Sequence, residues 1–261
     1  MYIKSANNQK IKNLIKLQKT REQRKQEKII IEGKENIIKA CFAKIKILEI
    51  FISTDFSKKN LDQIYKNYPN LKINIIDKKI FSKINYQKNN SGCLAIAEPK
   101  YLNLEDIKVE TNFLVLILEN IEKPGNLGAI VRTARATGVD LIIINDSQVN
   151  IYNPNVIYAS RGYLFEQKIV FASHSETINW LHKNKIKSFA TSAHAKSNYL
   201  ETSFCDNVAI VMGSEKEGLS EFWQSKADEF IQIPMQNTVQ CLNLSVSTAI
   251  ILFEIQRQKR A

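Results

Sequence analysis

The stretch that decides the fold is VAIVMGSEKEGLS, residues 208–220, together with IPMQNTVQCLNLSVSTAI, residues 233–250. The apolar run 208–212 has the length and composition of a buried strand, and it ends in a turn at Gly213. A second strand, 229–233, stops at Pro234, and an apolar helix follows over about 244–257. Polar side chains and glycines therefore stand just after strand ends, where open α/β sheets usually bind ligands.

The rest of the chain alternates between predicted strands and helices. In the first hundred residues the alternation predicts strands at 29–33, 45–53, 71–76 and 93–97 and helices at 35–43, 61–67 and 78–84. After residue 111 it predicts strands at 113–118, 141–145, 168–171, 188–192, 208–212 and 229–233 and helices at 129–137, 154–160, 176–183 and 244–257. Such alternation indicates an α/β protein: a small α/β domain over 1–98, a linker over 99–111, and a parallel-sheet domain over 112–261.

The excess of positive charge is confined to the first hundred residues of this chain. Residues 1–100 hold 22 Lys and Arg against 9 Asp and Glu, whereas residues 101–261 hold 15 against 17. A basic half beside a nearly neutral half indicates that one part binds a polyanion and the other does something else. We therefore expect nucleic-acid binding by the N-terminal part.

Residues 7–29 are predicted to form one amphipathic basic helix. Ile11, Leu14, Ile15 and Leu17 would make its apolar side. The alternative is a solvated helix face with no ligand. The cations expected to meet RNA phosphates are Lys10, Lys12, Lys16, Arg21, Arg24 and Lys25.

The composition points to the cytoplasm and away from metals and membranes. No apolar run approaches the roughly 18 residues that span a bilayer, and the N-terminus has no apolar signal region. The four cysteines form no CxxC pair, and the three histidines have no metal-ligand spacing. We expect a cytoplasmic protein without a metal site.

The predicted loop 119–128 and the helix after it carry the most telling polar residues. Gly125 and Gly128 give the spacing GxxG, which matches neither the dinucleotide-binding fingerprint nor a P-loop. Asn126 lies in the loop, and Arg132, six residues on, lies in an otherwise apolar window. A guanidinium there requires an anion: either an ion pair with Glu119 or Glu215, or a phosphate of a ligand.

Three motifs resemble those of the SpoU (TrmH) RNA 2'-O-ribose methyltransferases. They are PGNLGAIVRTA at 124–134, MGSEKEGLS at 212–220 and IPMQNTVQCLNLSVS at 233–247. Their order and spacing agree with the family across residues 112–261. Residues 1–97 are similar to the RNA substrate-binding domain often fused in front of it, through the basic helix and IIEG at 30–33.

The resemblance implies a SPOUT-class catalytic domain with a deep trefoil knot and a homodimer whose active site is completed across the interface. It implies S-adenosylmethionine as cofactor and structured RNA, foremost ribosomal RNA, as substrate. The catalytic residues by correspondence are Arg132, Asn126, Glu215 and Asn243. The cofactor-binding residues by correspondence are Thr191, Gly213, Ile233, Met235 and Leu242.

Three positions depart from the family pattern. Asn237 stands where the third motif usually has Gly, Cys241 where it has Ser, and Tyr158 where many members carry Arg. Cys241 keeps a small group with a weak donor, and Asn tolerates the left-handed backbone better than most residues.

Three other readings compete with ribosomal RNA methylation. One is the same reaction on tRNA, another is a resistance methyltransferase acting on ribosomal RNA, and the third is an assembly factor that binds RNA without catalysis. The presence of Arg132 and Asn243 argues against lost catalysis.

Overall fold

A seven-stranded sheet in which every pairing is parallel organises the C-terminal half, in the strand order β10-β12-β9-β11-β6-β7-β8. This confirms the predicted parallel-sheet architecture. The strands are β6 (Leu114–Glu119), β7 (Leu141–Asn145), β8 (Ile169–Phe171), β9 (Lys187–Thr191), β10 (Ser197–Asn198), β11 (Val208–Met212) and β12 (Glu229–Gln232). The trefoil knot implied by the resemblance remains a prediction.

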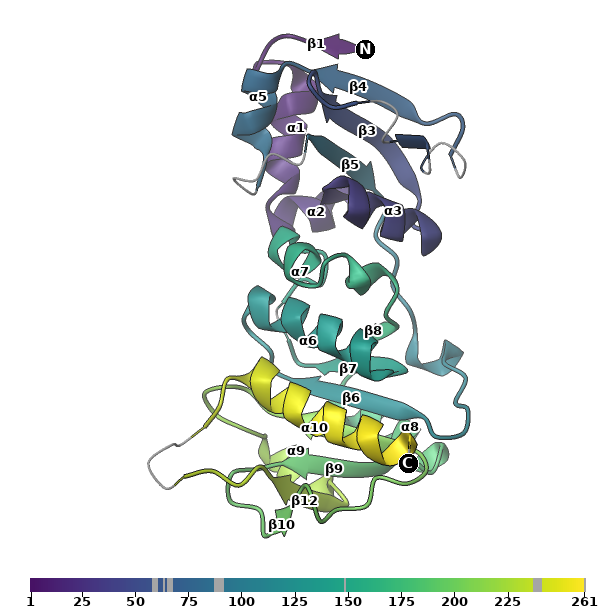
Figure 1. Ribbon diagram of the computed structural model, residues 1–261, viewed down its shortest axis with the longest axis vertical. Coiled ribbons are helices and arrows are strands. Elements are labelled where there is room, and N and C mark those ends of the chain that lie inside the picture. The colour runs from purple at the N-terminus through teal and green to yellow at the C-terminus, as the bar shows by residue number, and fades with distance from the viewer. Residues whose placement is uncertain are drawn as a thin grey trace. The chain divides into compact units, whose positions relative to one another are not determined.

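The computed structural model describes residues 1–57, 61–62, 64, 68–86, 92–147, 149–236 and 241–260 (Figure 1). Asn237, part of the predicted helix 61–67, and residues 89–91 of the stretch NNSG, whose composition predicts a turn, lie outside these residues. The chain divides into two units, Met1–Lys100 with Asn150–Glu166, and Tyr101–Val149 with Gln167–Ala261.

The helices of the second unit accompany its sheet. They are η2 (Leu104–Asp106), α6 (Pro124–Thr137), α8 (His174–Lys183), α9 (Glu221–Lys226) and α10 (Leu244–Arg260). In Figure 1, α10 runs beside α6, and the two helices pack against each other. The predicted linker 99–111 includes η2, where Leu104 is buried, and Leu102, which forms an isolated bridge with Val170 of β8.

Continuous apolar strands explain why this sheet lies in the interior. All six residues of β6 and all five of β7 and of β11 are buried. Parallel sheets have helices on both faces, so their strands are apolar along their whole length. The polar residues at the ends of these strands, Glu119 and Asn145, are buried too and must find hydrogen-bond partners there.

The first unit contains a mixed sheet in the order β1-β4-β3-β5-β2. β5 pairs antiparallel with β2 and β3, whereas β4 pairs parallel with β1 and β3. The strands are β1 (Tyr2–Ile3), β2 (Ile29–Glu32), β3 (Ile47–Ser53), β4 (Lys72–Ile76) and β5 (Cys93–Ala97). The helices are α1 (Gln9–Leu17), α2 (Thr20–Gln26), α3 (Lys34–Phe42), α5 (Lys78–Ile84), α7 (Pro154–Ala159) and η3 (Tyr163–Phe165).

The basic N-terminal segment forms two helices, which corrects the prediction of one. Asn8 caps α1 by accepting from the backbone of Lys10 at 2.9 Å, and the chain is extended at Lys19 before α2 begins. Gln23 then donates to the carbonyl of Leu17 at 2.8 Å, which satisfies an end of α1 inside the core. Ile15, predicted on the apolar side, is 46% exposed, while Ile11, Leu14 and Leu17 are buried as expected.

Residues 150–166 pack as part of the first unit. Asn150 donates to the Gln23 side chain at 2.6 Å, and the Lys39 ammonium donates to the Arg161 carbonyl at 2.7 Å and lies over the Tyr163 ring. A Cβ at Gly162 would lie 2.7 Å from the Asn36 side-chain oxygen, so the backbone approaches α3 closely there. This segment therefore helps to complete the first unit.

Several boundaries differ from the predictions for identifiable reasons. β1, β10 and α9 were not predicted, because runs of two to six residues carry little periodicity. α6 begins at Pro124, inside the predicted loop, because proline at the first helical position loses no hydrogen bond. It ends as predicted at Gly138, whose φ of 78° suits a left-handed cap.

Among the described residues, no helix combines the length and the apolar character needed to cross a lipid bilayer.

Candidate active site

The order in which the chain adds strands to the sheet of the second unit reverses between β6 and β11. From β6 the chain proceeds to β7 and β8 on one side, while β11 and β9 lie on the other. In parallel α/β sheets such a switch point opens a crevice at the carboxyl ends of the strands. The segments that leave these two strands are 120–123, before α6, and 213–220, before α9.

Three predicted catalytic residues meet at this switch point. The Glu215 carboxylate accepts hydrogen bonds from the side chains of Asn126 and Asn243, the latter at 3.3 Å. Asn243 also donates to the Asn126 oxygen at 3.4 Å. These residues come from α6, the loop after β11 and the residue before α10, so the fold joins the three sequence motifs in one cluster.

Local geometry keeps each member of this cluster in place. Asn126 lies in the first turn of α6, and the Asn243 oxygen accepts from the backbone and the hydroxyl of Ser245 at 2.9 and 2.6 Å. Glu215 lies in a tight hairpin in which Ser214 and Gly218 exchange backbone hydrogen bonds of 2.8 and 3.1 Å. These contacts thus determine the orientation of the two side-chain amides and of the carboxylate.

Lys123 is a member of the cluster that the sequence reasoning missed. Its ammonium pairs with Glu215, and the neighbouring Glu122 pairs with Lys216 at 3.3 Å. These oppositely directed pairs join the segment after β6 to the hairpin after β11. A small pocket between the two segments is lined by Asn120, Ile121, Glu122, Lys123, Asn126, Glu215, Lys216 and Leu244. The signal in the sequence was the position of Lys123 directly before Pro124, at the start of the helix.

Arg132 does not join this cluster. It lies in α6 and is exposed, and no hydrogen bond or ion pair of its side chain is found in the part of the chain that the structure describes. Six residues turn an ideal helix by about 600°, so Arg132 and Asn126 point about 120° apart. Of the two alternatives for Arg132, the ion pair with Glu119 or Glu215 is not formed: Glu119 bonds to His174 and Ser220, and Glu215 to the cluster.

The ends of three adjacent strands gather most of the predicted cofactor-binding residues. Thr191 ends β9, Gly213 follows β11 and Ile233 follows β12, in the sheet order β12-β9-β11. The Thr191 hydroxyl donates to the carbonyl of Val211 at 3.1 Å, so it serves the neighbouring strand. Met235 and Leu242 are half-buried and flank residues 237–240, which lie outside the described residues.

Gly213 is a position where only glycine fits. A Cβ there would lie 2.3 Å from the carbonyl carbon of Gly218 and 2.6 Å from the amide of Leu219. The hairpin 214–218 folds directly back onto this residue, so the backbone of Gly218 and Leu219, not a side chain, packs against the end of β11.

The predicted RNA-binding cations lie on the first unit, and all but one are exposed. Lys12, Lys16, Arg21, Arg24 and Lys25 extend into solvent from α1 and α2. Lys10 instead forms a half-buried ion pair with Glu49 and lies 5.8 Å from the centre of the Phe51 ring. The Lys10 ammonium is thus already paired within the first unit.

Among the described residues, no group of three or more His, Cys, Asp and Glu side chains is arranged to hold a metal ion.

Two family models match the chain. Residues 113–253 match the SpoU rRNA methylase family, and residues 8–95 match the MRM3-like substrate-binding domain. The first match includes the three segments that meet at Glu215.

Named relatives and solved structures agree with these matches. A relative from Staphylococcus aureus, named as a TrmH family tRNA/rRNA methyltransferase, is 31% identical over 89% of this chain and 97% of its own length. A crystal structure titled RNA 2'-O ribose methyltransferase is 31% identical and covers all of both chains, with a TM-score of 0.86. An AdoMet-bound rRNA methyltransferase from Sinorhizobium meliloti has the same fold, at 24% identity over 98% of this chain and 97% of that one and a TM-score of 0.90.

With the motif residues joined at the switch point and both family models matched along the chain, this protein belongs to the SpoU rRNA methylase family of RNA methyltransferases.

Proposed function

We propose that the protein transfers a methyl group from S-adenosylmethionine to a ribose 2'-hydroxyl of structured RNA, with ribosomal RNA as the foremost substrate. The observation that carries the proposal is the Asn126–Glu215–Asn243 cluster, in which three distant motifs present oriented amides and a carboxylate to one crevice. Such polar groups suit a ribose hydroxyl, because amides donate and accept while a carboxylate accepts.

The cofactor is proposed to lie at the ends of β9, β11 and β12. The residues present fit the cofactor, because Gly213 lets the hairpin 214–218 pack directly on the end of β11, and Thr191, Ile233, Met235 and Leu242 supply half-buried contact surface around it. When bound, S-adenosylmethionine supplies a methyl group that its sulfonium charge already activates. Two solved neighbours, an rRNA methyltransferase from Sinorhizobium meliloti and AviRb from Streptomyces viridochromogenes, hold bound AdoMet.

The chain's own task is to orient the ribose and to support the loss of its proton. Asn126 and Asn243 are proposed to hold the ribose, and Glu215 to hold the two amides in their productive orientation. Arg132 is proposed to bind the adjacent RNA phosphate and to stabilise the developing alkoxide. A guanidinium with a pKa above 12 is a poor base, so the proton would pass to phosphate or water.

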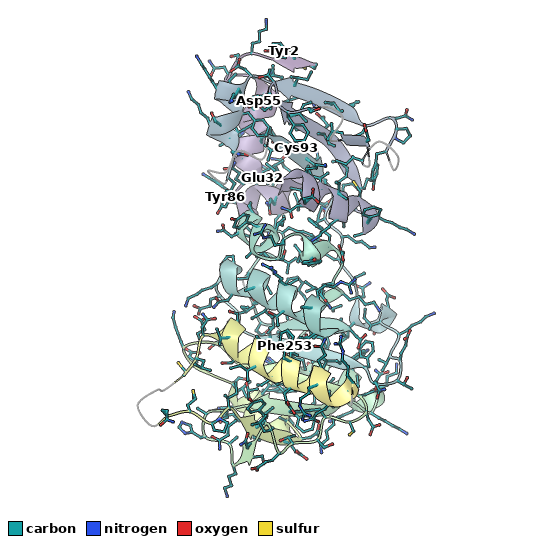
Figure 2. The ribbon with its side chains drawn as sticks, viewed as in Figure 1. Tyr2, Glu32, Asp55, Tyr86, Cys93 and Phe253 are labelled. Atoms are coloured by element: carbon teal, nitrogen blue, oxygen red, sulfur yellow. The ribbon has the colours of Figure 1, made fainter. Side chains whose placement is uncertain are left out.

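A second copy of the chain is proposed to complete the site. Arg132 points away from the cluster of its own chain, and α10 beside it carries an apolar stripe in which Val246 and Phe253 are exposed and Ile250 between them is half-buried (Phe253 is labelled in Figure 2). Spacings of four and three residues put these side chains on one face of the helix. Docking of two such faces would bury the stripe and bring Arg132 toward the partner's cluster.

The RNA is proposed to bind through the exposed cations of α1 and α2, which suits a long structured target. A relative from Coxiella burnetii named 23S rRNA (guanosine-2'-O-)-methyltransferase RlmB is 35% identical over 59% of this chain and 62% of its own length. Ribosomal RNA as substrate would place the reaction in the cytoplasm.

The direct test is to map 2'-O-methyl groups in ribosomal and transfer RNA from cells with and without the protein. Loss of one ribosomal site in the deletion is expected; loss of a tRNA site would change the substrate, and no lost site would favour a non-catalytic assembly factor. Restoring the gene as Arg132→Ala should leave the site unmethylated, whereas Arg135→Ala, on the same helix, should restore it. Methylation by Arg132→Ala at the wild-type level would refute the role of Arg132.

A further inference from the structure

A buried carboxylate at the end of β6 is not used by the proposed chemistry. Glu119 is 3% exposed, and both of its oxygens are engaged. One oxygen accepts from the Ser220 backbone at 2.8 Å, and the other accepts from the Ser220 hydroxyl at 2.5 Å and contacts His174 Nε2 at 2.5 Å. Burial of a charged group is costly unless such partners compensate it.

His174 joins this carboxylate to a second one. Its other ring nitrogen, Nδ1, lies 2.7 Å from the carboxylate of Asp146, directly after β7. Ionised carboxylates only accept hydrogen bonds, and the imidazolium form of the ring donates from both nitrogens, one to each partner. The Asp146 carboxylate is 61% exposed, so the Glu119 contact is the more strongly shielded from solvent.

The ring of His174 also packs on the residues that follow Ser220. Its centre lies 5.1 Å from that of Phe222 and 6.4 Å from that of Trp223. Trp223 is fully buried, and its indole donates to Asn145 at 3.3 Å. His174 thus holds the start of α9 both through Glu119 and by direct ring contact.

The arrangement is not a nucleophilic triad. In a triad the histidine contacts the serine and takes its proton. Here the Glu119 carboxylate lies between Ser220 and His174, so Ser220 donates to an acid that is already occupied. Glu119, His174 and Ser220 therefore stabilise the local fold and do not attack a substrate.

What these residues hold is the hairpin that carries Glu215. Ser220 ends the segment 213–220, Leu219 beside it is buried, and Ser214 and Gly218 close the hairpin between them. Glu215 is therefore placed by a segment attached at β11 on one side and at Glu119 on the other.

We propose that His174 and Glu119 are positioning residues for methyl transfer: His174 holds Glu119, Glu119 holds Ser220, and the hairpin then keeps Glu215 against Asn126 and Asn243. This inference rests on the proposed function. Neither residue touches the RNA or the cofactor in this scheme, so their loss affects the rate of transfer and leaves RNA binding intact.

The test compares His174→Ala and His174→Gln with His182→Ala, an exposed histidine on the same helix, in methyl transfer to the mapped RNA. Displacing Glu215 by about 1 Å would lower kcat about 100-fold. We expect that loss for His174→Ala with an unchanged KM for RNA, a smaller loss for His174→Gln, and no change for His182→Ala. Added imidazole is expected to restore part of the kcat of His174→Ala. A wild-type kcat in His174→Ala would overturn the proposal.

Hydrogen exchange keeps the test decisive if a variant folds poorly or if no RNA is methylated. In the wild-type protein the Ser220 amide is expected to exchange slowly, and in His174→Gln and Glu119→Gln faster, while amides of β7 stay unchanged. Fast exchange of the Ser220 amide in the wild type would refute the proposed attachment of Ser220 to Glu119. Slow exchange in a protein that methylates no RNA would refute the proposed function alone.

Discussion

Replacing Gly213 by alanine tests whether the hairpin after β11 is as closely folded as the structure shows. The new Cβ would lie 2.3 Å from the carbonyl carbon of Gly218 and 2.4 Å from its oxygen. Ordinary contacts begin at 3.4 Å, so the overlap is about 1.1 Å. Both atoms belong to the backbone, so no side-chain rotation relieves the clash and the hairpin must move.

The cost follows from the cost of overpacking. Forced backbone shifts cost about 1–3 kcal/mol, and at about 2–4 °C per kcal/mol the Tm should fall by about 2–12 °C. S-adenosylmethionine affinity should fall as well, because the hairpin borders the proposed cofactor site. Thermal melting and titration calorimetry on the purified protein measure the two effects.

Gly125→Ala is the matched control for this prediction. Gly125 lies in α6, where a Cβ would meet nothing within 4 Å, and alanine favours helices over glycine by up to about 1 kcal/mol. Its Tm should therefore stay level or rise. If Gly213→Ala melts and binds the cofactor as the wild type does, the close approach of Gly218 to Gly213 is refuted.

Three further predictions concern charge and exposure. The Arg257 guanidinium and the Gln258 amide hold the pKa of Glu254 at about 2 in the folded protein. The ionised Glu254 therefore contributes its full stabilisation above the usual carboxyl pKa and loses it as the pH falls toward 2. Melting curves should show Glu254→Gln less stable than wild type at pH 7, with the difference shrinking below pH 4.5. Burial raises the pKa of the Cys41 thiol to about 11 and that of the Cys93 thiol to about 12. A thiol-reactive dye at pH 8 should therefore label the exposed Cys205 and Cys241 quickly, and Cys41 and Cys93 only on unfolding. Rapid labelling of all four cysteines would contradict the buried positions of Cys41 and Cys93. Lys16→Ala and Arg24→Ala should each weaken RNA binding and lower the slope of log K against log salt by about one, whereas Lys10→Ala, which breaks a pair with Glu49, should leave that slope unchanged in filter-binding assays.

The elements that the sequence predicted well are those whose signals lie within a few residues. The buried strand 208–212, the helix over 78–84 and the end of the predicted helix at residue 137 all appeared where expected. The start of α8 was placed too late, although Ser173 and Glu176 form a capping box that marks it at His174. Short elements such as β10 were missed because two residues carry no periodicity.

The site divides in the same way. The motifs pointed to Asn126, Glu215 and Asn243 as residues of one site, because each belongs to a recognisable local pattern. Their hydrogen bonds join residues 89 and 117 positions apart, and only the sheet order brings those positions together. Arg132, predicted for the same site, does not join these residues, because six helical residues rotate it away from Asn126.

By itself the sequence determined the fold class, the separation of a basic part from a nearly neutral one, and the family, since composition and local motifs carry all three. The tertiary structure alone decided which polar groups are partners: Lys123 with Glu215, Glu119 with Ser220 and His174, and Lys10 with Glu49. The physical reason is that hydrogen bonds and ion pairs depend on distances of about 3 Å, whereas the chain between the partners spans dozens of residues. The hydrophobic pattern of the sequence specifies the strands. The order of these strands in the sheet then decides which polar side chains become partners.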